Sequence, residues 1–125
     1  PTVVLEVAHN KNGIEQMLLH LKNIKYDRLH IILGMVKDKD ATQVLELLPN
    51  SASYYFTNAH IPRALDAKDL QLKGSEYNLA GDRYENVNLA LRDALGNASR
   101  GDLLIVCGSI FLVAEVNKES IIQQA

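Results

Sequence analysis

The fold is decided by a continuous apolar run in the first third of the chain, Leu29-His30-Ile31-Ile32-Leu33-Gly34-Met35-Val36. A run of this kind predicts a β-strand that is buried on both faces, as in a parallel sheet covered by helices. The polar stretch 37–40 interrupts the run, and apolar residues then recur at helical spacing over 44–48. Pro49 ends that helix because proline has no backbone N–H to continue it.

Working outward toward the N-terminus, residues 2–7 are rich in β-branched side chains and predict another strand. A polar break follows, and apolar residues recur at helical spacing over 14–21. Asn12 lies three residues before Glu15, a spacing typical of a capping box. We therefore expect this helix to begin near Asn12 or Gly13.

The same alternation continues toward the C-terminus. Two further strands are predicted over 52–57 and 103–107, and two further helices over 84–95 and 110–116. Gly96 is the expected stop of the first of these helices, since glycine commonly follows a helix end.

The segment 58–83 is the least regular part, and we expect in it a short helix over 66–72 and a short strand over 77–79. Strands and helices thus alternate along the chain, which is the pattern of an α/β fold. The sequence predicts a three-layer, Rossmann-like domain with a mostly parallel sheet flanked by helices. Its 125 residues fit a single domain, 1–125, and no internal repeat or linker divides them.

Composition excludes several classes of protein. Lys plus Arg number 13 and Asp plus Glu number 15, a formal net charge of −2, so we expect no nucleic-acid partner. The single cysteine, Cys107, excludes an intrachain disulfide and is expected to be inert core. No apolar run approaches the roughly 20 residues that cross a bilayer, so we expect no membrane partner and a cytoplasmic location. The chain opens at Pro1 without Met, and we expect it to be a piece of a longer protein.

Ligands of parallel α/β sheets bind beyond the carboxyl ends of the strands. The predicted loops at that edge contain His9, His60, Arg63, Ser109 and the charged stretch 37–40. The sequence leaves open whether Arg63 has a structural role or clamps a ligand. The stretch 37–40 is interpreted as helix capping, because acidic residues favour the first turn of a helix.

Two of these loops have alternative interpretations. His9 and Asn10 stand at a helix start, where backbone N–H groups and the helix dipole favour an anion such as phosphate. The alternative is that Asn10 or Asn12 merely caps the helix and that His9 is a surface loop residue. Ser109 follows Gly108, and this turn either holds a carboxylate or phosphate or simply caps the last helix. A glycine-rich dinucleotide loop and a Walker A loop are both lacking, so the chain has half a nucleotide site at best.

Four motifs, in order and covering residues 3–116, resemble those of one family. Val4-Leu5-Glu6-Val7-Ala8-His9-Asn10-x-x-Gly13 is similar to the Asp-Gly-Ala-His-Asn-x-x-Gly motif that opens the C-terminal domain of folylpolyglutamate synthases and dihydrofolate synthases. Residues 34–40 are similar to the family's Gly-x-x-x-Asp-Lys-Asp motif. Residues 62–64 are similar to its Arg-Ala element, and residues 104–113 are similar to its closing Gly-Ser motif.

The resemblance implies the C-terminal domain of a Mur ligase-type enzyme. Such enzymes use ATP to convert a carboxylate into an acyl phosphate, which the amino group of an amino acid then attacks. In this family the acceptor is dihydropteroate or a folate, and the amino acid is L-glutamate. The phosphate-binding loop, the Mg²⁺ ligands and most of the folate site are expected in an N-terminal domain that is absent from this chain. No metal ligand is expected here, and the chain alone is expected to be inactive.

Residue by residue, the resemblance implies a catalytic role for His9 close to the phosphates. It implies that Glu6, His9 and Asn10 bind the ATP cofactor and that Ser109 binds the glutamate carboxylate, while Arg63 stays mainly structural. The chain departs from the family at Glu6 and Val7, where the family has Asp-Gly. The resemblance implies that the family's Asp, at the position of Glu6, approaches the nucleotide ribose. Glutamate is one methylene longer than aspartate, and valine lacks the backbone freedom of glycine, so this contact transfers least securely.

Two other functions compete with the ligase. The first is a stand-alone α/β module that binds a nucleotide or another small anion, and it predicts binding by the 125-residue chain itself. The second is a flavodoxin-like or receiver-like domain, which the Asp38-Lys39-Asp40 loop superficially suggests. The acidic cluster and the lysine that a receiver-like domain needs at its other strand ends do not recur.

Overall fold

A computed structural model describes residues 1–37, 41–119 and 121. Strands and helices alternate from end to end: β1 (Thr2–Leu5), α1 (Lys11–Leu21), β2 (Leu29–Leu33), α2 (Ala41–Leu47), β3 (Ser53–Phe56), α3 (Ala67–Glu76), β4 (Gly81–Arg83), α4 (Val87–Asn97), β5 (Leu103–Cys107) and α5 (Ile110–Ala114).

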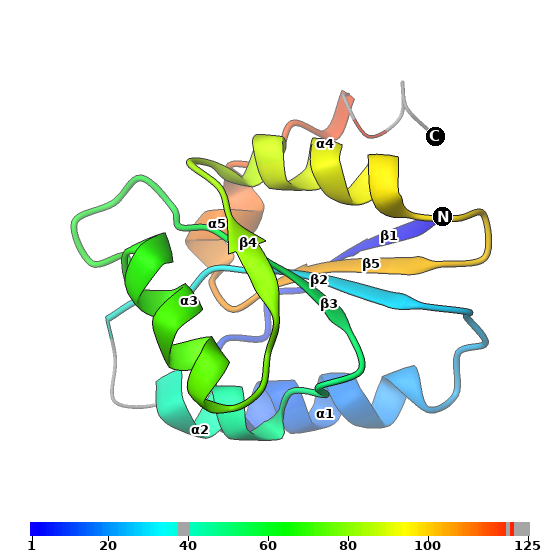
Figure 1. The fold of residues 1–125 in the computed structure, drawn as a ribbon, viewed down its shortest axis with the longest axis horizontal. Helices are drawn as coiled ribbons and strands as arrows, with labels where there is room; N and C mark the ends of the chain where they lie inside the picture. The colour runs from blue at the N-terminus through cyan, green and yellow to red at the C-terminus, as the bar shows by residue number, and fades with distance from the viewer. Residues whose placement is uncertain (38–40, 120, 122–125) are drawn as a thin grey trace.

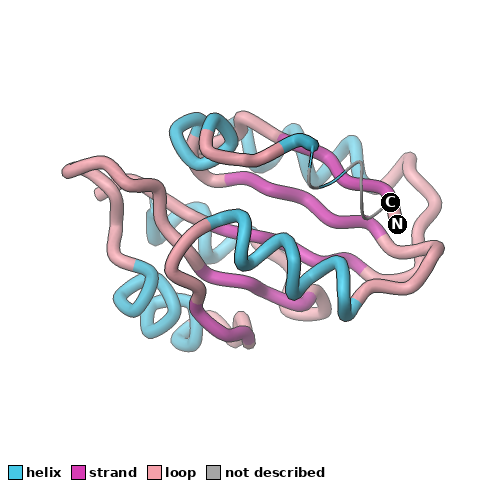
Figure 2. Tube along the Cα trace, turned by 90° about the horizontal axis from the view of Figure 1, so that it is seen from above, coloured by secondary structure: helices cyan, strands magenta, loops and turns pink. Residues whose placement is uncertain are grey.

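The described strands form one sheet in the order β1-β5-β2-β3-β4, and every neighbouring pair is parallel. Figure 1 shows α1 and α2 on one side of this sheet and α4 on the other. Seen from above, the strands run between the helices in Figure 2. The predicted three-layer α/β fold with a mostly parallel sheet is therefore confirmed.

Two apolar clusters hold the layers together. Successive side chains of a strand point to opposite faces of a sheet, and β2 illustrates this. Ile31 and Leu33 pack in the cluster that contains residues of α1, α2 and α3, whereas Ile32 packs with α4 and α5. All three side chains are fully buried. Burial on both faces explains why the sequence of β2 is a continuous apolar run rather than an alternating one.

Helix α1 begins at Lys11, close to the start predicted near Asn12 or Gly13, but the predicted capping box at Asn12 is wrong. The cap is Asn10, whose extended backbone leaves the strand and whose side-chain oxygen accepts a hydrogen bond from Gly13 N at 2.8 Å. Asn12 lies inside the first turn of the helix. Asn10, not Asn12, therefore caps the free N–H groups at the start of the helix.

The predicted strand over 77–79 is also wrong. Helix α3 extends to Glu76, and the chain then turns through Asn78, which has a φ of 62°. The strand that pairs with β3 lies later, at β4. Gly81 permits this pairing, because a Cβ at that position would lie 1.9 Å from the carbonyl oxygen of Tyr54.

Helix α4 differs from its prediction at both ends. It starts after Asn86, whose side chain accepts from Leu89 N, rather than at Tyr84. Gly96 does not stop it; the helix runs through Gly96 to Asn97 and ends where Ala98 becomes extended, with ψ 145°. The start of the helix is set by its cap, Asn86, which lies outside the apolar pattern. Its end is set by the change to an extended backbone at Ala98.

A buried polar network lies at the amino ends of the strands. Asp102, directly before β5, accepts hydrogen bonds from the backbone N–H groups of Ser99 at 3.0 Å and Arg28 at 3.1 Å. His30 Nδ1, at the start of β2, lies 3.0 Å from the Tyr55 hydroxyl of β3. These contacts join three neighbouring strands at the edge of the sheet opposite to the one where ligands are expected.

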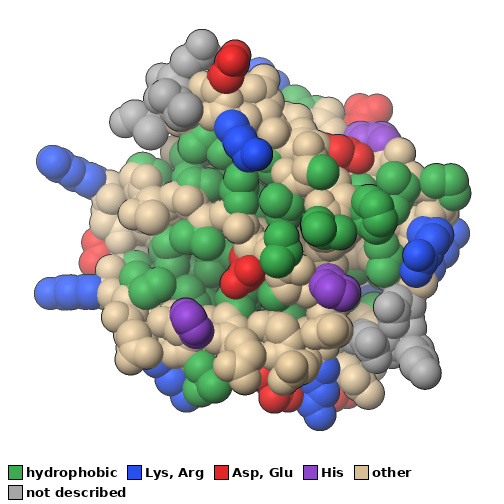
Figure 3. Space-filling view, turned by 180° about the vertical axis from the view of Figure 1, so that it is seen from behind, with side chains coloured by type: hydrophobic (Ala, Val, Ile, Leu, Met, Phe, Trp, Pro, Cys, Tyr) green, Lys and Arg blue, Asp and Glu red, His purple; other side chains and the backbone are tan. Residues whose placement is uncertain are grey.

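The surface seen from behind in Figure 3 carries many hydrophobic side chains across its middle, with charged side chains mainly around the rim. Among the described residues, the large hydrophobic side chains that are more than two-fifths exposed are Val7, Leu19, Ile24, Leu72, Ile110 and Phe111. Ile110 and Phe111 start α5 and lie at the carboxyl end of β5, beside the candidate site.

Candidate functional site

Because the sheet is parallel, the loops that follow β1, β2, β3 and β5 lie at one edge, as predicted. Segments from all four loops meet around a small cavity of about 220 Å³. It is lined by His9, Val36, Arg63, Gly108, Ser109, Ile110 and Phe111. Clefts for drug-sized ligands measure about 300–1,000 Å³, so this cavity suits a smaller molecule.

His9 provides an imidazole to this cavity from the loop between β1 and α1. Its Nδ1 lies 3.2 Å from the carbonyl oxygen of Val7. A carbonyl oxygen only accepts, so this contact places the hydrogen on Nδ1 and leaves Nε2 for a ligand. The side chain is exposed, and it immediately precedes the Asn10 cap of α1. This geometry is compatible with the predicted contact to phosphate, at a helix start whose dipole favours anions.

Ser109 lies in the same cavity, where it is also the N-cap of α5. Its Oγ accepts a hydrogen bond from Phe111 N at 3.1 Å. The hydroxyl hydrogen is still available to donate to a ligand, so the capping role and the binding role that the sequence left open are compatible. Gly108 sets the turn with a φ of 103°. A Cβ there would lie 2.3 Å from the carbonyl oxygen of Gly34, so glycine is required on two grounds.

Arg63 also lines the cavity, although we expected it to be mainly structural. It is exposed, and its position is fixed by a short antiparallel contact between the loops after β2 and β3. Lys37 N donates to the carbonyl oxygen of Arg63 at 2.7 Å, and Leu65 N donates to that of Met35 at 2.8 Å. The sequence signals for Arg63 were its place in the loop after the third strand, which a parallel sheet brings to the same edge as His9, and the similarity of 62–64 to the family's Arg-Ala element.

The other predicted site residues lie outside this cavity lining. Glu6 is half-buried, and its backbone N–H pairs with Val106; Asn10 uses its side-chain oxygen as the helix cap. Their predicted nucleotide contacts remain predictions. His60 pairs instead with Glu115, Nδ1 to Oε1 at 3.0 Å. Of the stretch 37–40, residues 38–40 lie outside the described part of the chain.

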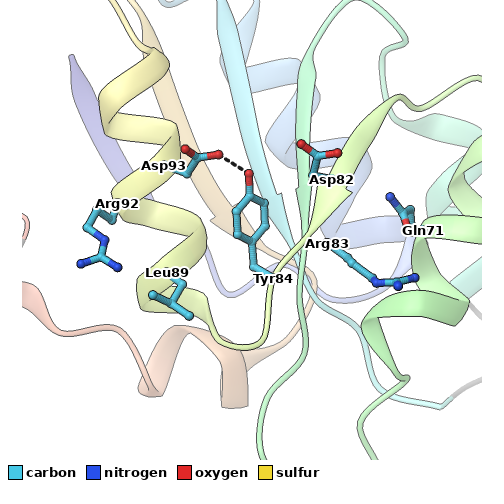
Figure 4. Close-up of a pocket in the computed structure, with 7 residues that line it drawn as sticks. All are labelled: Gln71, Asp82, Arg83, Tyr84, Leu89, Arg92 and Asp93. Carbon is cyan, nitrogen blue, oxygen red and sulfur yellow. Dashed lines mark hydrogen bonds between the residues drawn. The ribbon is translucent and has the colours of Figure 1, made fainter.

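A larger hollow lies elsewhere, between α3, β4 and α4 (Figure 4). It measures about 830 Å³ and is lined by Gln71, Asp82, Arg83, Tyr84, Leu89, Arg92 and Asp93. The Tyr84 hydroxyl donates to the carboxylate of Asp93. Burial, and to a smaller extent this hydrogen bond, raises the pKa of Tyr84. None of the predicted site residues lines this hollow, so we assign the site to the smaller cavity at the carboxyl edge.

Metal binding is not supported by the part of the chain that the structure describes. No group of three or more His, Cys, Asp or Glu side chains is arranged there to hold a metal ion. Cys107 is fully buried, and burial, with a smaller effect of Glu6, raises the pKa of its thiol to about 12. The prediction that Cys107 belongs to the core is confirmed. No helix within the described ranges is long and apolar enough to cross a membrane.

Comparison with known proteins identifies the family and the fold of this chain. A family model described as "Mur ligase, glutamate ligase domain" matches residues 1–110. The chain belongs to the Mur ligase glutamate ligase domain family. This confirms the family predicted from the four motifs, and it agrees with the parallel sheet and the edge at which the motif residues His9 and Ser109 gather.

The similar proteins are much longer than this chain. A probable bifunctional folylpolyglutamate synthase/dihydropteroate synthase of Haloferax volcanii is 35% identical over 120 residues, which are 92% of this chain and 14% of that protein. The structure of E. coli FolC in complex with DHPP and ADP matches with a TM-score of 0.84 and 27% identity, covering 98% of this chain and 29% of FolC. A bifunctional folylpolyglutamate synthase/dihydrofolate synthase with Mn, AMPPNP and L-glutamate bound matches with a TM-score of 0.81 and 27% identity, covering 95% and 29%. The chain thus spans less than a third of each of these proteins.

Proposed function

We propose that this chain is the C-terminal domain of an ATP-dependent ligase that adds L-glutamate to dihydropteroate or a folate through an acyl phosphate. The observation that carries this proposal is the cavity at the carboxyl edge, which brings an imidazole, a guanidinium and a hydroxyl together around a space of about 220 Å³. Similar proteins solved with ADP, with AMPPNP and with L-glutamate support it.

Each polar group of the cavity has a distinct task in this proposal. With its ring protonated on both nitrogens, His9 donates from Nε2 to the phosphate oxygens of ATP or of the acyl phosphate and stabilises the negative charge that develops on them. Ser109 donates its hydroxyl hydrogen to a carboxylate of glutamate. Together they hold the amino acid close to the acyl phosphate, so that the amino group attacks the carbonyl carbon and phosphate leaves.

Part of the apparatus must come from the remainder of the enzyme. ATP supplies the phosphoryl group, and the described residues of this chain offer no cluster for the Mg²⁺ that accompanies it. We therefore place the metal ligands, the phosphate-binding loop and most of the folate site in a further, N-terminal domain. Folate contacts from this chain remain secondary, and we propose a cytoplasmic location for the whole enzyme.

The test is a ligase assay on the full-length protein that contains this chain. We expect ADP release that requires both L-glutamate and a dihydropteroate or folate acceptor, with one glutamate added for each ADP formed. The Ser109→Ala variant should raise the glutamate concentration required more than the ATP concentration required. If the full-length protein turns over no ATP in the presence of both substrates, or if the 125-residue chain alone binds ATP tightly in calorimetry, the ligase proposal fails.

A further inference from the structure

Helix α5 and the turn before it contribute four of the seven residues that line the carboxyl-edge cavity: Gly108, Ser109, Ile110 and Phe111. The helix is only five residues long. A helix this short is not stable by itself, so contacts with the rest of the fold must hold it in place. The shape of the cavity, and the direction of the Ser109 hydroxyl in it, therefore depend on what fixes α5.

Apolar contacts hold one side of α5 against the core. Leu112 is fully buried, and Val113 packs half-buried against the same cluster, which also contains Val87 of α4 and Val106 of β5. Hydrophobic contacts are not directional, so they keep the helix on the core without closely fixing its orientation. Hydrogen bonds have a defined geometry and can fix it.

Glu115, the C-cap of α5, makes hydrogen bonds of this kind. Its Oε2 accepts from the backbone N–H of His60 at 2.7 Å, and its Oε1 lies 3.0 Å from Nδ1 of the same residue. The backbone carbonyl oxygen of Glu115 accepts from Asn88 Nδ2 of α4 at 3.0 Å. An exposed ion pair contributes little to stability by itself, but two contacts from one carboxylate to one residue restrict the geometry.

The loop that carries His60 is a firm support for this contact. Thr57 Oγ1 donates to the carbonyl oxygen of Tyr84 at 2.9 Å, directly after β4. Asn58 Oδ1 accepts from Ala67 N at 3.2 Å, at the start of α3. The loop after β3 is thus held by two elements other than α5, and the end of α5 is tied to a position that these elements set.

We infer that Glu115 is a positioning residue, which orients the Ser109 hydroxyl toward the amino acid substrate by fixing α5 against His60. This inference rests on the proposed ligase function and deepens it. Ser109 and Glu115 are the N-cap and the C-cap of the same short helix, so a contact at one end restricts the direction of the other. It also gives a task to His60, which lies at this edge of the sheet but not in the cavity lining.

The test uses steady-state kinetics of the full-length protein with Glu115→Ala and Glu115→Gln. Glu115→Ala removes both contacts with His60 and should raise KM for L-glutamate about three- to tenfold, the effect of about one hydrogen bond. KM for ATP should stay within about twofold, because the effect passes through Ser109. Glu115→Gln should restore KM for glutamate to within about twofold of the wild type, since an amide oxygen still accepts from the His60 N–H.

Combined variants show whether Glu115 acts through Ser109. In a Ser109→Ala background, Glu115→Ala should raise KM for glutamate less than about twofold further, because two residues that act through one contact are not additive. His60→Ala removes the ring contact and keeps the backbone one, so it should give a smaller rise in the same direction even if Glu115→Ala folds poorly. Glu76→Ala is the matched control, since Glu76 is exposed on α3 and none of the ion pairs among the described residues includes it.

Several results would overturn the inference. Unchanged kinetics in Glu115→Ala, with a native or a lowered melting temperature, would leave Glu115 no role beyond stability. Equal rises in KM for ATP and for glutamate would indicate a general disturbance of the domain. Effects of Glu115→Ala and Ser109→Ala that multiply fully would show that Glu115 does not act through Ser109. A wild-type protein without glutamate-dependent turnover would remove the proposed function and this inference together, whereas an active wild type with an unaffected Glu115→Ala would remove the inference alone.

Discussion

His30 Nε2 donates a hydrogen bond to Asp102 Oδ2 at 2.9 Å, and the two residues are 1% and 2% exposed. Asp102 also pairs with Arg28 Nη2 at 3.2 Å. The backbone hydrogen bond from Ser99 has the largest effect on the pKa of this carboxyl. Together with the contacts from His30 and Arg28, it outweighs burial, which alone would raise the pKa. The pKa of Asp102 is thereby lowered from 3.8 to about 2.

This relationship predicts an acid-sensitive contribution to stability. A carboxyl whose pKa is lower in the folded state stabilises the fold fully above its unfolded value of 3.8. The contribution is lost as the pH falls from about 4 to about 2. We expect Asp102→Asn to reduce the free energy of unfolding at pH 7 and to flatten its dependence on pH in this window. Urea titrations at several pH values measure both; Asp82→Asn, at an exposed position of β4, is the control. An Asp102→Asn protein with the pH dependence of the wild type would contradict the prediction.

Tyr55→Phe should destabilise the fold by about 1–3 kcal/mol, because it leaves a buried nitrogen of His30 without its partner. The hydroxyl of Tyr55 lies 3.0 Å from His30 Nδ1 and accepts from Asn97 Nδ2 at 3.3 Å. Urea denaturation gives the difference in free energy of unfolding. Tyr77→Phe is a matched control, since Tyr77 is half-buried and no side-chain hydrogen bond joins it to another described residue. Equal stabilities of the two variants would show that the buried hydroxyl contributes nothing.

Substitution by alanine should change the stability of the protein in opposite directions at two glycines, Gly108 and Gly96. Gly108→Ala should strongly destabilise the turn that presents Ser109, because of the φ of 103° and the 2.3 Å approach of a Cβ to Gly34 O. Gly96→Ala should stabilise the protein by about 0.5–1 kcal/mol, since alanine favours the helix. A Cβ at Gly96 meets no atom within 4 Å. Thermal unfolding of the two variants, compared with the wild type, checks both; melting temperatures that move in the same direction would refute the pair.

The thiol of Cys107 should not react with an alkylating reagent in the folded protein at pH 8. Its pKa is raised to about 12, and the residue is fully buried, so both the thiolate and access to it are lacking. Mass spectrometry after treatment with iodoacetamide, with and without urea, measures this. Because the chain has one cysteine, any added mass reports this site. Rapid modification without urea would show that β5 opens readily.

His9→Ala in the full-length protein should lower turnover about a hundredfold or more without changing the melting temperature. The ring is exposed, and among the described residues its one hydrogen bond is to Val7 O, so its removal disturbs little of the fold. Measurement of kcat together with thermal unfolding separates the chemical role from a structural one. A normal kcat with native stability would exclude His9 from the phosphate site.

The sequence predicted the fold well because burial leaves a direct trace in composition. Ile31, Ile32 and Leu33 are buried on both faces of the sheet, and such a strand has to be continuously apolar. Helix starts and the edge strand were harder to predict. The start of α1 depends on which asparagine reaches Gly13 N, and the place of β4 depends on the turn at Asn78.

The candidate site was predicted in part. The parallel order of strands brings His9 and Ser109 together, as the sequence indicated, since both follow strand ends. The place of Arg63 in the cavity lining was not predicted, because it depends on a contact between two loops, Val36 with Ala64. The contacts of Glu6 and Asn10 with a nucleotide remain predictions, because neither residue lines the cavity.

The bridge between Val36 and Ala64 also couples the backbones of two loops that are far apart in sequence, so that they should move together. A ligand that shifts Arg63 must carry Lys37 and the backbone around Met35 with it, because hydrogen bonds of 2.7 and 2.8 Å tie them together. The amide protons of Lys37 and Leu65 should then exchange with solvent at similar rates and slow together when the cavity fills. Ligand binding beside Arg63 would then reach the backbone of Met35 and Lys37 directly, without any side chain in between.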